Sequence, residues 1–287
     1  MLDAQQRRYL LNLILQASAE FRMKRIVCQT NHGDLMVDVR DTDIGHTLLT
    51  QGEYGYTEMQ NFIAHSGVAR GTGDLIDIGA NIGTTSIPLA LDGVFKKISS
   101  FEPDPNNFHM FNYNVHNNKL NTIIQPFNLA MGSTPGTVEF ELSTDNFGDH
   151  RIKHKDFGTG AYNEGTRAHI DVECTTLDTM IANKSINIDT VVLIKSDTQG
   201  NEGHVLKGAK NVLALRRIPW VIEFWPYGLD RSCMPRDEVS AIVMANFSSF
   251  IELKEDGITV DSAPIDKFPE LFGRYDGVRW CNLILKP

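Results

Sequence analysis

The sequence predicts an α/β fold built on a doubly wound, mainly parallel sheet with helices on both faces. From Asp74 onward, short apolar runs alternate with helix-length segments, and strands joined by helices form βαβ units. The first apolar run, LIDI, passes directly into Gly79-Ala80-Asn81-Ile82-Gly83. In such sheets, glycines at this turn let the backbone approach a ligand. The last two strand-like segments follow each other without a helix, which predicts an antiparallel strand pair.

The first seventy residues precede the alternation, and we expect them to form an extension packed on a core domain of residues 71–287. The runs RIVCQT and DLMVDV flank NHGD, which predicts a hairpin around residues 25–39. A helix is expected over residues 57–68. Residues 1–21 fit an amphipathic helix, and its apolar side would carry Leu10, Leu11, Ile14 and Leu15.

The core domain is predicted to hold seven strands. Five apolar runs alternate with helical segments, and these runs are DLIDIG, KISSFE, TIIQPFN, DTVVLIKS and IPWVIEF. The terminal pair is FSSFIELKEDGITV and VRWCNLILK. Helices are expected over residues 83–92, over PNNFHMFNYNVHNN and over residues 202–215.

Residues 144–171 interrupt this pattern with a polar, glycine-rich segment. Twenty-eight residues without clear periodicity are too many for an ordinary connection, so the segment is either a functional lid or disordered. It contains His150 and His154, but no helical pattern surrounds them. We therefore predict no metal site there.

Composition excludes several classes of protein. The net charge is −9 and no dense run of lysine or arginine occurs, so a nucleic-acid partner is not expected. The apolar part of the N-terminal helix is short and interrupted by Asn12, which argues against a signal peptide or a membrane span. Four separated cysteines without a C-x-x-C pair are typical of free thiols in a reducing compartment. A cytoplasmic protein is the expectation.

Two acids at strand ends suggest which ligand the glycine turn binds. The spacing Gly79-x-x-x-Gly83, with Asn81 between, departs from the G-x-G-x-x-G of dinucleotide-binding turns. Glu102 ends the second strand, where an acid accepts hydrogen bonds from both hydroxyls of a ribose. Asp77, near the end of the first strand, could meet an ammonium group directly or through water. A ribose joined to an amino acid describes S-adenosylmethionine, although either acid alone could be a solvated strand-end residue.

The sequence resembles the FkbM-type methyltransferases from about Gly52 to Phe224. The resemblance is carried by DIGANIGTTS, FEPDPNNFHMFNYNVHNN, NLAMGSTPGTVEF, TTLDTMI, IKSDTQGNEGHVLKGA and WVIEFWP. Thr198 and Gln199 depart from the family, which often has an apolar residue and an acid there. The resemblance implies a Rossmann-like methyltransferase sheet and S-adenosylmethionine as cofactor. The cofactor residues would be Asp77, Gly79, Ala80, Asn81, Gly83, Thr84, Glu102 and Asn128.

The resemblance also implies O-methylation, typically of a sugar hydroxyl in a glycan, glycolipid or secondary metabolite. Such a transfer needs a base near the hydroxyl. Asp197 is the expected base, and Lys195, two residues earlier on the same side of the strand, would orient it or the acceptor. Glu202 and Glu223 would be supporting acids or metal ligands. A bound Mg²⁺ is conceivable beside these acids.

Other interpretations remain open for the same residues. Lys195 and Asp197 could be a structural ion pair, and Glu202 could complement a helix dipole. The run Trp225-Pro226-Tyr227 could form a stacking wall for a sugar or could simply pack. An NAD-linked oxidoreductase and a catalytically silent module that binds S-adenosylmethionine are the alternative functions. The acceptor would be a small molecule or glycan, and the sequence assigns no oligomeric state.

Overall fold

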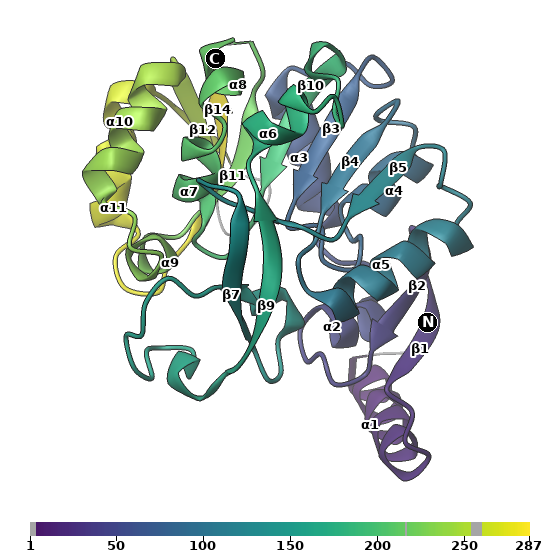
Figure 1. Ribbon diagram of the computed structural model, residues 1–287. Coiled ribbons are helices and arrows are strands. Elements are labelled where there is room, and N and C mark those ends of the chain that lie inside the picture. The colour runs from purple at the N-terminus through teal and green to yellow at the C-terminus, as the bar shows by residue number, and fades with distance from the viewer. Residues whose placement is uncertain (1–3, 216, 254–259) are drawn as a thin grey trace.

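The structure is a computed structural model that describes residues 4–215, 217–253 and 260–287. Its centre is a mixed sheet of eight strands (Figure 1). Five neighbouring strands run parallel, and β14 is antiparallel to both of its neighbours. In spatial order the strands are β13 (Val260–Pro264), β12 (Ser249–Leu253), β14 (Cys281–Lys286), β11 (Trp220–Phe224), β10 (Val191–Ser196), β3 (Asp74–Ile78), β4 (Ile98–Phe101) and β5 (Ile124–Phe127).

The predicted fold class is confirmed, with one strand more than expected. The segment FSSFIELKEDGITV holds β12 and the first residue of a further strand, β13, and these two strands pair antiparallel with Ser249 opposite Pro264. The antiparallel pairing of β12 with β14 is the predicted terminal strand pair.

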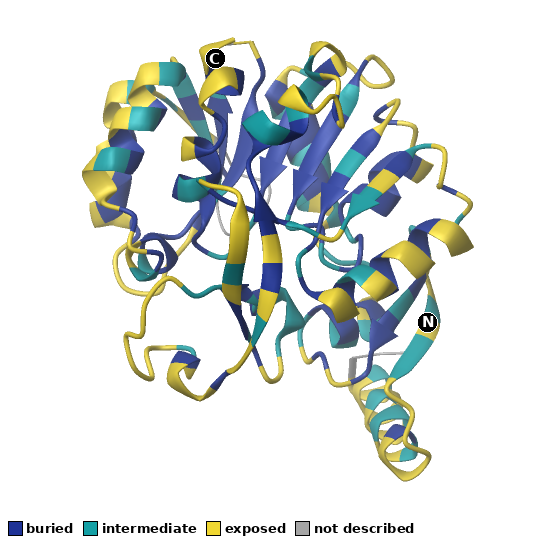
Figure 2. Cartoon of the chain, in the orientation of Figure 1, coloured by how far each residue is buried: buried dark blue, intermediate teal, exposed yellow. Residues whose placement is uncertain are grey.

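Successive residues of a strand point to opposite faces of the sheet. Apolar side chains therefore project from both faces, and helices cover both. Leu75 packs in one hydrophobic cluster and Ile76 in the other, and Leu193 and Ile194 divide in the same way. The buried strands form a continuous core in Figure 2. One face packs against α2 (Ile44–Gln51), α3 (Tyr56–Ser66), α4 (Ser86–Leu91) and α5 (Pro105–Asn117). The other packs against α6 (Leu177–Ala182), α7 (Glu202–Lys207), α8 (Lys210–Ala214), α9 (Pro226–Arg231), α10 (Arg236–Asn246) and α11 (Leu271–Arg274).

The N-terminal residues form the expected helix and hairpin. Helix α1 (Ala4–Glu20) projects from one end of the molecule (Figure 1). Strands β1 (Arg25–Thr30) and β2 (Gly33–Asp38) pair antiparallel. The Asn114 side chain of α5 hydrogen-bonds both the N–H and the carbonyl of Met36, which joins the hairpin to the core.

A second, four-stranded sheet forms from the segment between β5 and α6. It consists of β6 (Ala130–Met131), β9 (Ala168–Thr175), β7 (Gly136–Leu142) and β8 (Arg151–Ile152). Residues 144–171 therefore supply β8 and the start of β9, together with short 3₁₀ turns at Phe147–Asp149 and Glu164–Thr166. Further 3₁₀ turns lie at Ile188–Thr190 and Ile265–Glu270.

None of the described helices combines the length and apolar character needed to cross a bilayer. The four cysteines form no disulfide within the described residues.

Candidate functional site

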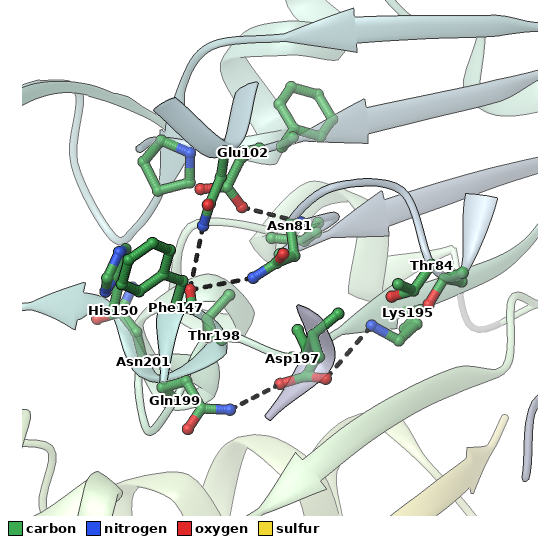
Figure 3. A pocket seen from close by; sticks show the side chains of 18 of the residues that line it. Asn81, Thr84, Glu102, Phe147, His150, Lys195, Asp197, Thr198, Gln199 and Asn201 are labelled. Atoms are coloured by element: carbon green, nitrogen blue, oxygen red, sulfur yellow. Dashed lines mark hydrogen bonds and ion pairs between the residues drawn. The ribbon is translucent and has the colours of Figure 1, made fainter. Parts of the chain in front are cut away.

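A cleft opens at the carboxyl ends of β3, β4 and β10 (Figure 3). It encloses about 1170 Å³, the open solvent at its mouth included. This is the edge at which ligands bind in open α/β sheets. The α2–α3 region, the start of α5 and the 144–171 segment contribute to its walls, and so do residues 129–131, Phe140 and Asn282.

The turn after β3 is shaped by residues with positive φ. Gly79 has φ +84°, and a Cβ at this position would lie 1.8 Å from the backbone oxygen of Asp197, so only glycine fits. Asn81 adopts φ +51°, a conformation that asparagine tolerates better than most residues. Its side-chain oxygen accepts from Ile82 N at 2.7 Å, and its amide donates to the Phe147 carbonyl at 3.1 Å.

Glu102 is buried beside this turn. Its two carboxyl oxygens accept hydrogen bonds from the backbone N–H groups of Asn81, at 2.9 Å, and Asp104, at 2.8 Å. Burial, assisted by the charges of Asp104 and Asp77, raises the pKa of Glu102 to about 8. Asn128 lies behind it and donates to the Glu102 carbonyl at 2.8 Å, which fixes the end of β4.

Lys195 lies between two carboxylates on the floor of the cleft. Its Nζ is 3.5 Å from Asp77 Oδ1 and 3.5 Å from Asp197 Oδ2. Burial lowers the pKa of Lys195, but Asp197 and Asp77 together raise it above its usual value. The ammonium group is therefore charged at neutral pH.

Asp77 lies behind the wall of the cleft. Its side chain is fully buried and does not line the cleft. The ammonium group that it meets in the structure belongs to Lys195, and its other oxygen accepts from Ser86 Oγ at 2.6 Å. A direct contact with a ligand ammonium would require this arrangement to open.

Asp197 is the most accessible acid of this group, with a side chain 40% exposed. The Gln199 amide donates to Asp197 Oδ1 at 3.1 Å and reaches Glu223 Oε1 at 3.5 Å. Burial, with the charges of Asp197 and Glu202, raises the pKa of Glu223 well above its usual value. This shift favours the uncharged form of Glu223, whereas Asp197 lies directly beside the Lys195 ammonium.

Glu202 shapes the loop before α7. Its Oε1 accepts from the N–H of Thr198 at 2.6 Å and from its hydroxyl at 2.7 Å. Burial raises the pKa of Glu202 to about 7. Among the residues that the structure describes, no group of three or more His, Cys, Asp or Glu side chains is arranged to hold a metal ion.

The structure brings six of the expected site residues together on the cleft wall: Gly79, Asn81, Thr84, Glu102, Lys195 and Asp197. The other six lie behind this wall and do not line it. They are Asp77, Ala80, Gly83, Asn128, Glu202 and Glu223.

Ala80 and Gly83 fail to reach the cleft for a packing reason. Ala80 is buried in the hydrophobic cluster of the α4–α5 face. A Cβ on Gly83 would lie 2.6 Å from the Phe111 ring, so this glycine allows close packing of α5.

Trp225 also packs rather than forming an open wall. It is 3% exposed, and the Arg151 guanidinium lies 4.7 Å from its ring centroid. Tyr162 and Tyr227 meet the same ring at centroid distances of 5.3 Å. In this structure a sugar has no free face of Trp225 on which to stack.

Several lining residues were not predicted from the sequence, among them Tyr54, Glu58, Phe147 and His150. Phe147 accepts at its carbonyl from Asn81 and Asn107. His150 Nδ1 accepts from the Ser143 N–H at 2.9 Å. Burial, with the nearby charge of Arg167, lowers the pKa of His150 to about 4, so the ring is neutral and its proton resides on Nε2. For Phe147 and His150, the available sequence signal was the run FGDH in the polar segment.

Comparison with known proteins places the chain in a family. Residues 77–233 match the Methyltransferase FkbM domain, which is more than half of the chain. The chain belongs to the FkbM methyltransferase family. Methyl transfer is the activity of this family, and no curated protein matches the chain.

Solved structures similar to this FkbM-family chain include three transferases. An FkbM methyltransferase from Methylobacillus flagellatus KT is 16% identical, with a TM-score of 0.45 over 86% of this chain and 56% of its own. A putative transferase from Pyrococcus horikoshii is 13% identical (TM-score 0.40, 92% and 72%). A Pyrococcus abyssi tRNA (uracil-54, C5)-methyltransferase in complex with S-adenosyl-L-homocysteine is 10% identical (TM-score 0.43, 91% and 43%). The chain thus spans little more than half the length of the first of these.

Proposed function

We propose that this protein transfers the methyl group of S-adenosylmethionine to a hydroxyl oxygen of a sugar in a glycan, glycolipid or secondary metabolite. One observation carries the proposal. The backbone of Asp197 lies against Gly79, at a distance that leaves no room for a Cβ. The acid proposed as base therefore stands directly beside the turn proposed to hold the cofactor, with both facing one cleft.

The cofactor is proposed to lie along the ends of β3 and β4. Glu102 would accept hydrogen bonds from the ribose hydroxyls once its carboxyl group is deprotonated. Gly79, Asn81 and Thr84 would contact the cofactor as lining residues of the turn. Asp77, Ala80, Gly83 and Asn128 would act indirectly, by holding Lys195, the turn and the end of β4 in place.

The bound cofactor would supply an electrophilic methyl group on a sulfonium. The acceptor oxygen forms a bond to the methyl carbon as the carbon–sulfur bond breaks, and its proton passes to the Asp197 carboxylate. Lys195, 3.5 Å away, would hold that carboxylate in position. Glu223 and Glu202 are proposed to support it as neighbours whose raised pKa values favour the uncharged form.

Ligand titration of the purified protein tests the cofactor assignment. We expect S-adenosylhomocysteine to bind in isothermal titration calorimetry and NAD to give no heat of binding. Binding of NAD without S-adenosylhomocysteine would instead support the oxidoreductase. For the acceptor, mass spectrometry of glycans from cells with and without the gene should show a methyl group that depends on the protein.

A further inference from the structure

Gln199 has a backbone conformation that is unusual for its residue type. Its φ is +57°, in the left-handed region that residues other than glycine and asparagine rarely adopt. In the described part of the chain, the other residues with positive φ are glycines, Asn81, Asn163 and four residues two positions beyond the end of a helix, namely Arg22, Lys119, Lys184 and Cys233. Left-handed residues commonly terminate helices. Gln199 is the exception, because it lies in the loop after a strand.

The neighbours of Gln199 hold the loop in this conformation. The N–H of Thr198 donates to the Glu202 carboxyl group at 2.6 Å. A Cβ at Gly200 would lie 2.4 Å from the backbone carbonyl carbon of Gly228, so the loop packs closely on α9. The backbone is thus held on both sides of Gln199, and a glycine would adopt the same conformation with less strain.

The side chain gives a reason for a glutamine at this position. Its amide donates to Asp197 Oδ1 at 3.1 Å (Figure 3), and the same nitrogen is 3.5 Å from Glu223 Oε1. The other oxygen of Asp197, Oδ2, lies 3.5 Å from the Lys195 ammonium. Each carboxyl oxygen of Asp197 therefore has its own donor, and together the two donors limit rotation of the carboxyl group.

A neutral donor suits this position better than a charged side chain. Lys195 is already shared between Asp77 and Asp197, and a second cation would make the Asp197 carboxylate a weaker base. A carboxylate in place of the amide would offer no donor and would repel Asp197. The amide of Gln199 can orient the carboxyl group without adding charge of either sign.

We propose that Gln199 is a positioning residue, which holds the Asp197 carboxyl group in a fixed orientation at the cleft. Strained backbone conformations concentrate at functional sites, where the surrounding structure maintains them. Gln199 does not touch the reacting atoms and acts through Asp197. That Asp197 is the base rests on the proposed function, whereas the hydrogen bond from Gln199 does not.

The side-chain amide signal of Gln199 in NMR tests this contact without any methyl transfer. In ¹⁵N-glutamine-labelled protein, Gln199→Met identifies the signal by its absence. We expect Asp197→Asn to shift the signal, because the amide loses its charged acceptor. Asp189→Asn, at an exposed acid, should leave it in place. An unshifted signal in Asp197→Asn would show that Gln199 does not hold Asp197.

Two substitutions separate the amide from the backbone. Gln199→Met keeps a left-handed side chain without a donor, and Gln199→Gly also relieves the strain. In transfer of labelled methyl from S-adenosylmethionine to extracted glycans, both should lower kcat about 10- to 50-fold. The KM for S-adenosylmethionine should stay within about twofold of the native value. In an Asp197→Asn background neither change should lower kcat further, because a residue that acts through Asp197 has no effect there.

Urea unfolding tests the alternative that Gln199 only stabilises the fold. Lys184→Gly is the matched control, since Lys184 is exposed and has a φ of +59°. Both Gln199→Gly and Lys184→Gly should unfold at the native urea concentration or a higher one, because each relieves strain, and Lys184→Gly should keep native activity. A lower midpoint for Gln199→Gly would make the role of Gln199 structural and overturn the proposal.

The outcomes separate this inference from the proposed function. If the native protein transfers no methyl group but the Gln199 signal responds to Asp197→Asn, the proposed function fails and Gln199 remains the residue that orients Asp197. If the native protein is active and both Gln199 variants keep its kcat, the proposed function stands and the positioning role is wrong.

Discussion

The two carboxylates around Lys195 differ in what surrounds them. Asp77 is fully buried, whereas the Asp197 side chain is 40% exposed to the cleft. A buried ammonium needs a partner on the side away from the ligand, and Asp77 supplies it. Asp197 is then the more accessible of the two acids, as its proposed role as the base requires.

Replacement of Asp197 by asparagine tests the base. Asn keeps the shape of the side chain but cannot take up a proton, so we expect kcat to fall about 10²- to 10⁴-fold with little change in affinity for S-adenosylhomocysteine. Transfer of labelled methyl from S-adenosylmethionine to extracted glycans measures the rate. Asp189→Asn, at an exposed site, is the control. Nearly full activity of Asp197→Asn, with an inactive Glu223→Gln, would move the base to Glu223.

Glu102 predicts a pH-dependent affinity. Its pKa of about 8 means that the carboxyl group is mostly protonated at pH 6, and a ribose is best bound by the carboxylate. The affinity for 5′-methylthioadenosine, which has the ribose but no amino acid group, should rise up to about tenfold per pH unit below pH 8 and then level off. Glu102→Gln should bind weakly and without this slope. A flat profile for the native protein in calorimetry between pH 6 and 9 would remove Glu102 from the ribose site.

At the scale of elements, the 144–171 segment has two different parts. The first part and the last contribute to the cleft and to a buried ion network, since Phe147 and His150 line the cleft and Arg167 binds Asp149. Residues 154–161 between them are exposed. This middle part is the longest exposed stretch of the segment and is the part that could act as a lid.

Replacing residues 156–161 by a Gly-Ser linker of equal length tests the role of the exposed middle part apart from that of the parts that line the cleft. We expect affinity for S-adenosylhomocysteine to stay within about threefold, because the cleft lining is kept, and methyl transfer to fall at least tenfold if a lid must exclude water. The exposed Asp189→Asn protein is again the reference. Normal transfer by the linker variant would show that no lid function resides there.

On the scale of the whole molecule, buried acids make stability depend on pH in an unusual direction. Burial raises the pKa of Glu202 from 4.5 to about 7. Between these values the folded state keeps a proton that the unfolded chain has lost. The free energy of unfolding should therefore fall as the pH rises through this window, by at most about 1.4 kcal/mol per pH unit for each such group.

Urea unfolding at pH 5, 6, 7 and 8 measures this dependence. Glu202→Gln keeps an oxygen for Thr198 but does not titrate, so its stability should fall less steeply with pH than that of the native protein. Glu139→Gln, at a half-exposed acid, should leave the slope unchanged. Equal slopes for the native and Glu202→Gln proteins would mean that Glu202 is charged in the fold.

The sequence predicted the sheet well because its signal is local. Leu75 and Ile76 belong to an apolar run whose length and flanking turns identify a buried strand, and the packing of both faces follows. The same local signal placed Glu102 and Asp197 at the carboxyl edge. It could not show that Lys195 neutralises Asp77, because that contact joins side chains of two strands.

The walls of the cleft were less predictable for the same reason. Tyr54 and Glu58 precede residues 77–233, the stretch that matches the family domain, and they reach the cleft because α3 packs on the sheet. Arg151 covers the ring of Trp225, although the two residues are 74 positions apart in the chain. Such contacts depend on the whole fold, and no spacing of residues encodes them.

The contact of Gly79 with the Asp197 backbone has a consequence for protein engineering. A loop exchanged from a relative after β3 must fit the relative's loop after β10, because the two backbones touch without an intervening side chain. Altering the turn after β3 alone would displace Asp197, and altering the loop after β10 alone would distort the turn that contains Gly79. Recombination between family members should therefore succeed only when both loops come from the same parent.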